Sequence, residues 1–499
     1  AAVDAATNND EIRVAAGLYD QEQGTEGATL YVNKSLNILG GYTTTNWIAP
    51  DPDANVAILD GQNLRRVVWL FSGNGSIEGF TIRNGDLDSG NGAGVFVDEN
   101  AIQLISNNRI HNNTADGTQG GGVAVLGEAI LLANQIYGNS ADFGGGVNVT
   151  SGGAVTLLSN LIYENTAASE FGSGGIGAQQ DGGTLSIWHN TIADNSAPNG
   201  NNGGGGVALF EGTVTFYNNV IANNTAAGGD TGLYVTGASV TGSHNNFFGN
   251  SFSATLSNAI NGDPLFVDAA NDDYHLDIGS PNINAATATF PADIDFELQP
   301  RPFDGAADVG ADEYYPVGAE CFARVNDGAV DGEVFSDPQV AIDLAQAGEL
   351  VKIAGRCTGS GGEIITVGTD IIVQGGYQLT NWSSLLRGQE PTILDGENAR
   401  RLVVVTADSP TVDSLHLVNG NSTTGAAVYV TGGSPLISNN IVDNNTALFG
   451  NRLSNQAVTL VQLNLMSMLG HLATNLIGPR CQHQLLIFFI QQINVRVVE

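Results

Sequence analysis

Short apolar runs separated by Gly, Asn and Thr follow one another through the first 260 residues, and they recur at a regular spacing. The form N-x-I-x-x-N occurs at 108–113, 134–139, 160–165, 190–195 and 219–224, and again at 245–250 with Phe in place of Ile. The steps between these units are 26, 26, 30, 29 and 26 residues. One such unit cannot bury its apolar face alone, whereas stacked units bury a continuous core and pair their strands. The pattern therefore predicts a solenoid of stacked β-coils.

Alignment of the coils predicts which side chains share a column. One inward column is expected to contain Leu131, Leu157, Ile187 and Phe216, and a second Ile110, Ile136, Ile162, Ile192 and Ile221. The repeated asparagines fall where the chain must bend. Their short amides tolerate left-handed conformations and can hydrogen-bond along the stack. They are therefore interpreted as structural.

A longer repeat indicates a duplication. Residues 40–42 and 45–47 (Gly-Gly-Tyr and Thr-Asn-Trp) recur at 375–377 and 380–382, and the block 58–61 (Ile-Leu-Asp-Gly) recurs at 393–396. The offset is 335 throughout. A second, truncated solenoid is thus expected to begin near residue 318.

The chain from about residue 451 follows another pattern. It has no Asp, only two Gly, and both Met of the chain. This tail is interpreted as out-of-frame or foreign sequence, and an amphipathic cap over the end of the solenoid is the alternative.

Two resemblances to known protein families support the prediction of a β-solenoid. The Gly-Gly-Val and I-x-x-N pairs resemble the repeats of polymorphic outer-membrane proteins and other right-handed β-helix repeat proteins. Segment 262–315, with Gly-Asp-Pro-Leu-Phe at 262–266 and Asp-Val-Gly-Ala-Asp-Glu at 308–313, is similar to the closing modules of bacterial surface β-helix proteins called choice-of-anchor domains. The resemblance implies export and a secreted or cell-surface life. It also implies the broad fold of pectate lyases, although no pectate-lyase catalytic motif matches residue by residue.

The expected fold class is therefore all-β: a right-handed parallel β-helix in two tandem copies, the second truncated. The expected domains are a first β-helix at 1–260, a closing or capping module at 261–317, a second, partial β-helix at 318–450 and the tail at 451–499.

Charge and cysteine content narrow the function classes. The chain has 51 acidic and 16 basic residues among 499, a net charge of −35. Such a chain is repelled by nucleic acid and by anionic membranes. No apolar stretch is long enough to span a bilayer, and no signal peptide is visible, so we expect the leader to be missing from this sequence. Cys321 and Cys357 could pair with each other, whereas Cys481 lies in the tail.

Two carboxylates are the catalytic candidates. Glu164 and Asp194 occupy equivalent positions of adjacent coils, which lie about 4.8 Å apart in a parallel stack. At that distance they repel unless they share a proton or a cation, and the separation suits a retaining glycosidase. The structural alternative is a solvated turn in which both acids point into water.

Aromatic residues near these acids are the substrate-binding candidates. Tyr137 and Tyr163 share one position on adjacent coils, and Trp188 and Tyr217 share another. Facing outward, they would offer aromatic shelves to sugar rings, but they could equally stiffen the sheet by stacking. The extra residues of the two longer coils, at 168–173 and 198–204, could wall a cleft around them. His189 lies in the same region.

Metal chemistry has one weak candidate. The segment 86–91 (Asp-Leu-Asp-Ser-Gly-Asn) resembles a calcium loop through Asp86, Asp88 and Asn91, but it lacks the terminal bidentate Glu. Calcium is therefore the one candidate cofactor.

Two functions remain. The first is a non-catalytic secreted or cell-surface protein with a structural, adhesive or glycan-binding role. The second is a polysaccharide lyase or glycoside hydrolase that uses Glu164 and Asp194 on an extracellular polysaccharide.

Overall fold

A computed structural model describes most of the chain. The described residues are 2–23, 27–48, 50–150, 152–179, 183–288, 292–316, 320–326, 331–359, 361–379, 382, 385, 392–447 and 459–461. They form two compact units: unit 1 contains residues 1–301 and 306–314, and unit 2 contains residues 302–305 and 315–499. Apart from 459–461, the tail at 451–499 lies outside the described residues, and so does the prediction about its origin.

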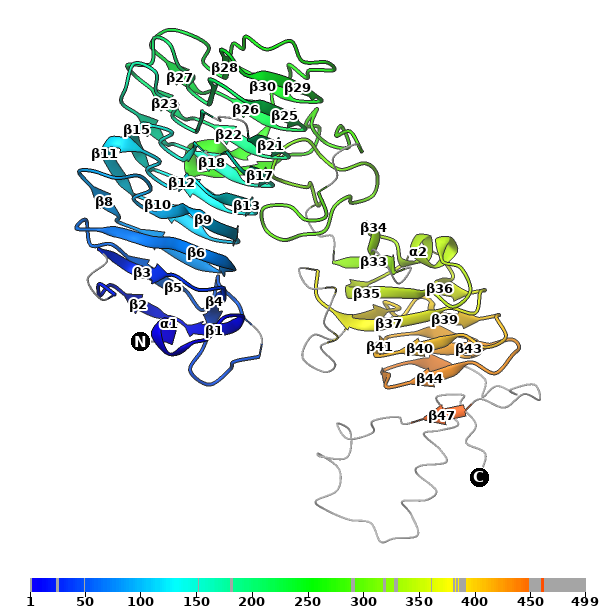
Figure 1. The fold of residues 1–499 in the computed structure, drawn as a ribbon. Coiled ribbons are helices and arrows are strands. Elements are labelled where there is room, and N and C mark those ends of the chain that lie inside the picture. Colours follow the sequence, from blue (N-terminus) through cyan, green and yellow to red (C-terminus); the bar gives the residue numbers. More distant parts are fainter. Residues whose placement is uncertain are drawn as a thin grey trace. The chain divides into compact units, whose positions relative to one another are not determined.

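Unit 1 is a stack of parallel β-coils (Figure 1). The coil at 123–143 shows the plan, with four short strands joined by bends: β12 (Val123–Val125), β13 (Glu128–Leu132), β14 (Gln135–Tyr137) and β15 (Ser140–Phe143). Each strand pairs in parallel with its counterpart one coil away, as in the register Leu131↔Leu157. The all-β solenoid predicted from the repeats is confirmed.

The strands of unit 1 form three sheets that run along the stack. Sheet A starts with β1 (Asp10–Ala15), β3 (Ala28–Val32), β4 (Leu36–Tyr42), β6 (Arg66–Glu78) and β9 (Val95–Ser106), and then divides. One branch, sheet A1, contains β12, β16 (Val147–Val149), β20 (Ile176–Ala178), β24 (Val207–Leu209) and β28 (Leu233–Val235). The other, sheet A2, contains β13, β17 (Ala154–Leu158), β21 (Thr184–Trp188), β25 (Thr213–Tyr217) and β29 (Ser239–Ser243).

Sheets B and C complete the coils. Sheet B contains β2 (Gly17–Tyr19), β5 (Ala57–Asp60), β7 (Phe80–Arg83), β10 (Arg109–His111), β14, β18 (Leu161–Tyr163), β22 (Thr191–Ala193), β26 (Val220–Ala222) and β30 (Asn246–Phe248). Sheet C contains β8 (Asp86–Leu87), β11 (Thr114–Gln119), β15, β19 (Thr166–Ala167), β23 (Ser196–Ala197) and β27 (Thr225–Ala226). The short helix α1 (Ala2–Ala5) precedes β1.

The core lies inside the coils, and both predicted columns are confirmed. Every one of their nine side chains is fully buried, and the register pairs each with its neighbour, as in Ile136↔Ile162 and Ile187↔Phe216. Burial of each such side chain contributes roughly 1.5–3 kcal/mol. The columns therefore supply a large part of the stability of unit 1.

The asparagines form two hydrogen-bonded ladders. In one, Nδ2 of Asn134 donates to Oδ1 of Asn160, and the contact recurs along the stack. In the other, Asn139, Asn165 and Asn195 repeat it. The predicted bonding along the stack is confirmed, but the left-handed conformation falls on the preceding residue, such as Glu164 or His189. The Asn134 side chain, for example, accepts from Asn108 one coil earlier and donates to Asn160 one coil later.

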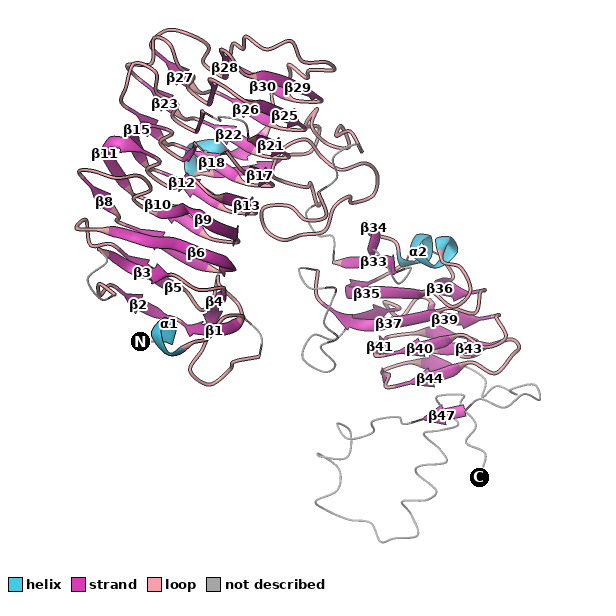
Figure 2. Cartoon of the chain, in the orientation of Figure 1, coloured by secondary structure: helices cyan, strands magenta, loops and turns pink. Residues whose placement is uncertain are grey.

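The described residues of 261–301 and 306–314, called the module, fold back over the flank of unit 1. The module is mostly loop (Figure 2), with an antiparallel pair of β31 (Phe266–Asp268) and β32 (Asp273–Leu276) around a short 3-10 helix, Ala269–Asn271. Its apolar side chains pack on the outer face of sheet B. The end of the stack is covered instead by residues 251–260, where Phe252 stacks on Phe247 at 4.1 Å between ring centroids.

Unit 2 starts with a hairpin and a helix: β33 (Cys321–Asn326), β34 (Asp331–Phe335) and α2 (Pro338–Leu344). Parallel coils follow, made of β35 (Leu350–Cys357), β36 (Glu363–Val367), β37 (Ile372–Tyr377), β38 (Thr392–Asp395), β39 (Arg401–Val405), β40 (Thr411–Asp413), β41 (Leu415–Val418), β42 (Asn421–Ser422), β43 (Val428–Val430), β44 (Leu436–Ser438), β45 (Ile441–Asp443), β46 (Thr446–Ala447) and β47 (Thr459–Val461).

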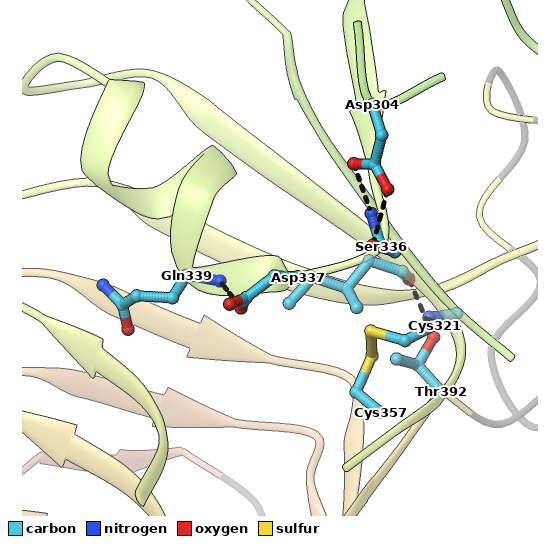
Figure 3. The surroundings of a disulfide bond; sticks show 9 residues. Asp304, Cys321, Ser336, Asp337, Gln339, Cys357 and Thr392 are labelled. Carbon is cyan, nitrogen blue, oxygen red and sulfur yellow. Dashed lines mark hydrogen bonds between the residues drawn. A yellow bond between two sulfur atoms is a disulfide. The ribbon is translucent and has the colours of Figure 1, made fainter. Parts of the chain in front are cut away.

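A disulfide joins Cys321 to Cys357 (Figure 3), a pairing that the sequence left open. Beside it, the carboxylate of Asp304 accepts hydrogen bonds from the backbone N–H and the hydroxyl of Ser336. The disulfide closes a loop that begins at Cys321, the first residue of β33, and ends at Cys357, the last residue of β35.

Within the described residues, no helix has the length and apolarity that crossing a membrane requires.

Candidate functional site

The outer face of sheet B brings several predicted residues into one row. The register aligns Asp60, Arg83, His111, Tyr137, Tyr163, Ala193, Ala222 and Phe248 across successive strands. A parallel row next to it contains Arg109, Gln135, Leu161, Thr191 and Val220. Because side chains alternate along a strand, both rows point away from the core.

The docked module divides this face in two. Tyr163 is 4% exposed and Ala193 is fully buried, whereas Tyr137 one coil earlier remains partly exposed. The covered half begins at β18 and continues to the end of the stack. The open half extends from β5 to β14 and presents Arg83, Arg109 and His111 together with Gln135 and Tyr137.

The aromatic side chains in this row stack on one another. The rings of His111 and Tyr137 lie 4.8 Å apart at 9°, and those of Tyr137 and Tyr163 lie 4.9 Å apart at 11°. Tyr274 of the module continues the series at 4.9 Å from Tyr163. Near-parallel rings at this spacing turn their faces toward each other, so the open half presents mainly ring edges and polar tips.

Burial and charge set the protonation of this stack. Burial, with the nearby Arg83 and Arg109, lowers the pKa of His111, so the imidazole is neutral at physiological pH. Burial, together with the charge of Asp272, raises the pKa of Tyr137 and keeps its hydroxyl protonated. The row thus offers neutral hydrogen-bonding groups between charged ones.

Ion pairs fix the two arginines of the open half. Nε of Arg83 lies 2.9 Å from the Asp60 carboxylate in the same row. Arg109 reaches Asp53, which precedes β5, at 2.7 Å. Each arginine side chain still keeps about a third of its surface exposed (34% and 38%). The open half of the outer face of sheet B thus has Asp53 on one side and the module on the other.

The two predicted catalytic acids lie at one corner, between sheets B and C. Glu164 and Asp194 both have a left-handed backbone conformation, and each directly precedes a ladder asparagine, Asn165 or Asn195. The hydroxyl of Tyr274 donates to Asp194 at 2.9 Å. Burial raises the pKa of both acids, and the charge of Asp272 raises both further. The structure thus brings a third acid, from the module, to the predicted pair.

His189 lies under the module and has no exposed surface. Its Nδ1 is 2.8 Å from Nη1 of Arg301 and 3.1 Å from the carbonyl of Asp308, and the amide of Asn218 is 2.9 Å from its Nε2. This arrangement leaves no surface of the ring for a ligand. In this structure His189 anchors the module to the stack.

Trp188 and Tyr217 belong to another face. They end strands β21 and β25, where they are register partners in sheet A2. Nε1 of Trp188 donates to the hydroxyl of Thr215 at 2.9 Å. The structure therefore separates this pair from the stacked tyrosines, although all four lie near the same bends in sequence.

The two expanded loops stack on each other beyond sheet C. The backbone N–H of Asn202 donates to the carbonyl of Glu170 at 3.1 Å, and the Asn199 amide donates to the carbonyl of Ala168 at 2.9 Å. They follow β19 and β23, and so they continue from sheet C toward sheet A1. Their hydrogen bonds join them to each other, to sheet C and, through the hydroxyl of Ser173, to the carbonyl of Ile176 in β20 of sheet A1.

Part of the stack is similar to a known protein family. Residues 67–252 match the family model of the right handed beta helix region. A solved structure that resembles the chain is the crystal structure of pectate lyase Pel9A, at 14% identity and a TM-score of 0.37, covering 63% of this chain and 90% of that one. A likeness of this size carries no argument about activity. No curated protein matches the sequence.

The β-solenoid was thus predicted from the repeats, but several residues of its flank were missed. His111 holds the same position after Asn108 as Tyr137 holds after Asn134, so coil alignment could have found it. Arg83 and Arg109 become neighbours of that position through the register alone. No sequence signal placed Asp272 or Tyr274 there, because the module does not repeat.

The calcium candidate lies along sheet C of the right-handed β-helix. Burial, and the charges of Asp116 and Asp88, raise the pKa of Asp86. The guanidinium of Arg66 donates to the carbonyls of Asn91 and Gly92 at 2.8 and 3.1 Å. Among the described residues, no cluster of three or more His, Cys, Asp or Glu side chains is arranged to hold a metal ion.

Proposed function

We propose that the protein is an exported β-helix that binds an extended glycan along the open half of sheet B without cleaving it. The observation that carries this proposal is the boundary on the outer face of that sheet. Arginine, histidine, glutamine and tyrosine side chains remain accessible up to β14, and the module covers everything beyond. A flat, polar and periodic surface of this kind suits a linear polymer better than a compact ligand.

The side chains of the open half fit sugar hydroxyls. Arginine offers several donors in a rigid fork, and tyrosine and glutamine both donate and accept. Arg83 and Arg109 are already held by Asp60 and Asp53, so they lose little freedom on binding. The stack of His111 and Tyr137 is equally preorganised. Affinity would then come from many modest contacts along several coils.

The test uses the full chain and a panel of neutral and acidic polysaccharides. We expect retention on at least one of them, without new reducing ends or ultraviolet-absorbing unsaturated products. Arg109→Ala and Tyr137→Ala should each weaken retention, whereas Arg13→Ala should not, because Arg13 pairs with Glu11 away from sheet B. Retention that is equal in all four proteins, or absent from the whole panel, would exclude this surface as the binding site.

A second candidate is a polysaccharide lyase or glycoside hydrolase that uses Glu164 and Asp194. The raised pKa of both acids favours it, because a partly buried carboxyl group can hold a proton for general acid catalysis. Against it, the Asp194 carboxylate accepts the hydrogen bond of Tyr274. Product formation that disappears in Asp194→Asn, with the thermal midpoint unchanged, would establish this candidate in place of the first.

We also propose that the two units are tandem copies of one β-helix, the second truncated. The 335-residue offset maps β5 onto β38 end for end, and Arg66 at the start of β6 onto Arg401 at the start of β39. It also maps the stacked pair Tyr42–Trp47 onto Tyr377–Trp382, and the rings are 6.0 Å apart in both. Coincidence of strand ends and of a tertiary contact supports duplication more strongly than the sequence repeat alone.

Export and a secreted or cell-surface location complete the proposal. The Cys321–Cys357 disulfide supports it, because such bonds persist mainly in oxidising compartments. The net charge of −35 also suits a protein that must stay soluble outside the cell. Mass analysis of the native protein under non-reducing conditions would test this step, and free thiols at both cysteines would count against it.

A further inference from the structure

A second group of aromatic side chains lies on the outer face of sheet A1, away from sheet B. Phe210, just after β24, is at its centre. The Phe210 ring lies 5.6 Å from Phe143, 6.3 Å from Phe171 and 5.9 Å from Tyr234. These four side chains are called the aromatic platform. None of them contributes to the core or to the site on sheet B.

The strands beneath the platform carry small side chains. The outward row of sheet A1 aligns Ala124, Asn148, Gly177 and Ala208 before it reaches Tyr234. A Cβ atom added to Gly177 would lie 2.7 Å from the Phe143 ring. A side chain at 177 would therefore displace the Phe143 ring from its present position. Gly177 and Ala208 thus leave room on the strands for these aromatic rings.

Phe171 is brought to the platform by an expanded loop. The loop at 168–173 has extra residues compared with the earlier coils, and it is held against the next loop by the hydrogen bonds of Asn202 and Asn199. The Phe171 side chain nevertheless remains 53% exposed. An aromatic ring held in the solvent by an ordered loop, next to three other rings, is typical of a binding surface.

Acidic residues greatly outnumber basic ones in the part of the chain that carries the platform. Between residues 110 and 300 the chain contains 17 Asp and Glu but no Lys or Arg. Three of the four aromatic residues are adjacent in sequence to an acid, in the pairs Asp142–Phe143, Glu170–Phe171 and Phe210–Glu211. A ligand for this surface must therefore tolerate or use carboxylates. Such carboxylates disfavour an anionic glycan.

We propose that the aromatic platform binds a glycan whose sugar rings carry protonated amino groups. Sugar rings stack their C–H faces on exposed aromatic rings. Aromatic faces and carboxylates both attract ammonium groups, through cation–π and charge-assisted hydrogen bonds. The same carboxylates accept hydrogen bonds from sugar hydroxyls. This inference goes beyond the glycan binding proposed for sheet B, because the two surfaces share no residue.

The test measures binding of a β-1,4-linked glucosamine hexasaccharide to the full chain by titration calorimetry, with the fully N-acetylated hexasaccharide for comparison. We expect the amine form to bind and the acetylated form to bind much more weakly. Phe171→Ala should raise the Kd of the amine form about fivefold, the effect of losing one exposed cation–π contact. Glu211→Gln should weaken binding similarly.

Two matched control variants are in β13 of sheet A2. Ile130→Ala removes an equally exposed apolar side chain (47%), and Glu128→Gln removes one exposed carboxylate. Both should leave the Kd unchanged. Because Phe171 and Glu211 are exposed, their variants should keep the thermal midpoint of the unmodified chain. Phe210→Ala, at the centre of the platform, provides a second aromatic variant.

Three results would overturn the proposal. The first is unchanged affinity for the amine form in both Phe171→Ala and Phe210→Ala. The second is equal affinity for the amine and acetylated forms. The third is equally tight, platform-dependent binding of a lysine hexapeptide, which would make this a site for basic peptides. Arg109→Ala distinguishes the two surfaces. It should weaken retention on the polysaccharide that binds sheet B and leave the Kd of the hexasaccharide at the platform unchanged.

Discussion

Asn165 links three coils through one buried amide. Its Nδ2 donates to the carbonyls of Ile136 and Tyr163 and to Oδ1 of Asn195 at 2.8–3.0 Å. Its Oδ1 accepts from the backbone and the side chain of Asn139. Repetition alone predicted that such residues bond along the stack. It did not predict which residue is left-handed, because the residues at that position differ from coil to coil.

Replacement of this amide should be costly. In Asn165→Ala, several buried groups on three coils lose their partners, and we expect a loss of about 3–5 kcal/mol in the free energy of unfolding of unit 1. Urea denaturation would measure it. Asn199→Ala is the control, because Asn199 is exposed and donates one side-chain hydrogen bond, to Ala168. Equal stability of the two variants would show that the ladder does not hold the coils together.

His275 should give the module a dependence on pH. Its ring contacts Glu297 at 3.1 Å and Asp273 at 2.6 Å, and the hydrogen bond to Glu297 is the main reason that its pKa rises from 6.5 to about 10. A raised folded-state pKa stabilises the fold below the unfolded value. The stabilisation should therefore be complete below pH 6.5 and be lost as pH rises to about 10.

Thermal melts across that range would test the assignment. The midpoint of the unmodified chain should fall as pH rises through the window, whereas the midpoint of His275→Gln should change less and start lower at pH 6.5. Glu297→Gln should reproduce most of the change that His275→Gln makes to the pH dependence of the thermal midpoint. Identical pH profiles for the unmodified chain and His275→Gln would show that the imidazolium contributes nothing to folding.

At the scale of elements, the coils were predictable and the position of the module was not. Repeats of known period determine strands, columns and ladders, because every coil faces a copy of itself. The module faces the flank, and its seat depends on Ala193 and Ala222, two small residues where the earlier coils carry Tyr137 and Tyr163. Nothing in the spacing of the repeat marks that change. The sequence therefore did not predict that the module contacts Asp194 and buries His189.

The small side chains beneath the module suggest how to detach it. Ala222 is fully buried among the apolar residues of the module and of sheet B. Ala222→Leu should overpack this interface by about 1–3 kcal/mol. Hydrogen exchange of the module should then accelerate, while the strands of sheets A and C keep their protection. Ala227→Leu, at an exposed position just after β27, should have no effect on exchange. Uniformly faster exchange throughout unit 1 would mean that module and coils unfold together.

At the scale of the whole molecule, each unit has a short helix beside its first coil, α1 in unit 1 and α2 in unit 2. Unit 1 begins with α1, and its Val3 joins the core of the stack. Unit 2 begins with a hairpin tied by a disulfide to the end of β35. The sequence left the pairing of Cys321 with Cys357 open, and the structure shows the disulfide. The sequence did not predict the hairpin of β33 and β34 or helix α2, because neither lies in the blocks that recur at an offset of 335 residues.

Loss of this disulfide should affect unit 2 alone. The bond joins residues 36 apart, and loop-closure entropy predicts that its removal costs roughly 3–4 kcal/mol. Both cysteine side chains are buried, so Ala in their place adds a small cavity cost. The Cys321→Ala/Cys357→Ala double variant should therefore lower the unfolding transition of unit 2 in differential scanning calorimetry and leave that of unit 1 in place. Mild reduction of the unmodified chain should give the same profile. A shift of both transitions would show that the two units unfold as one cooperative body, and an unchanged profile would show that the coils of unit 2 hold their first hairpin without the covalent link.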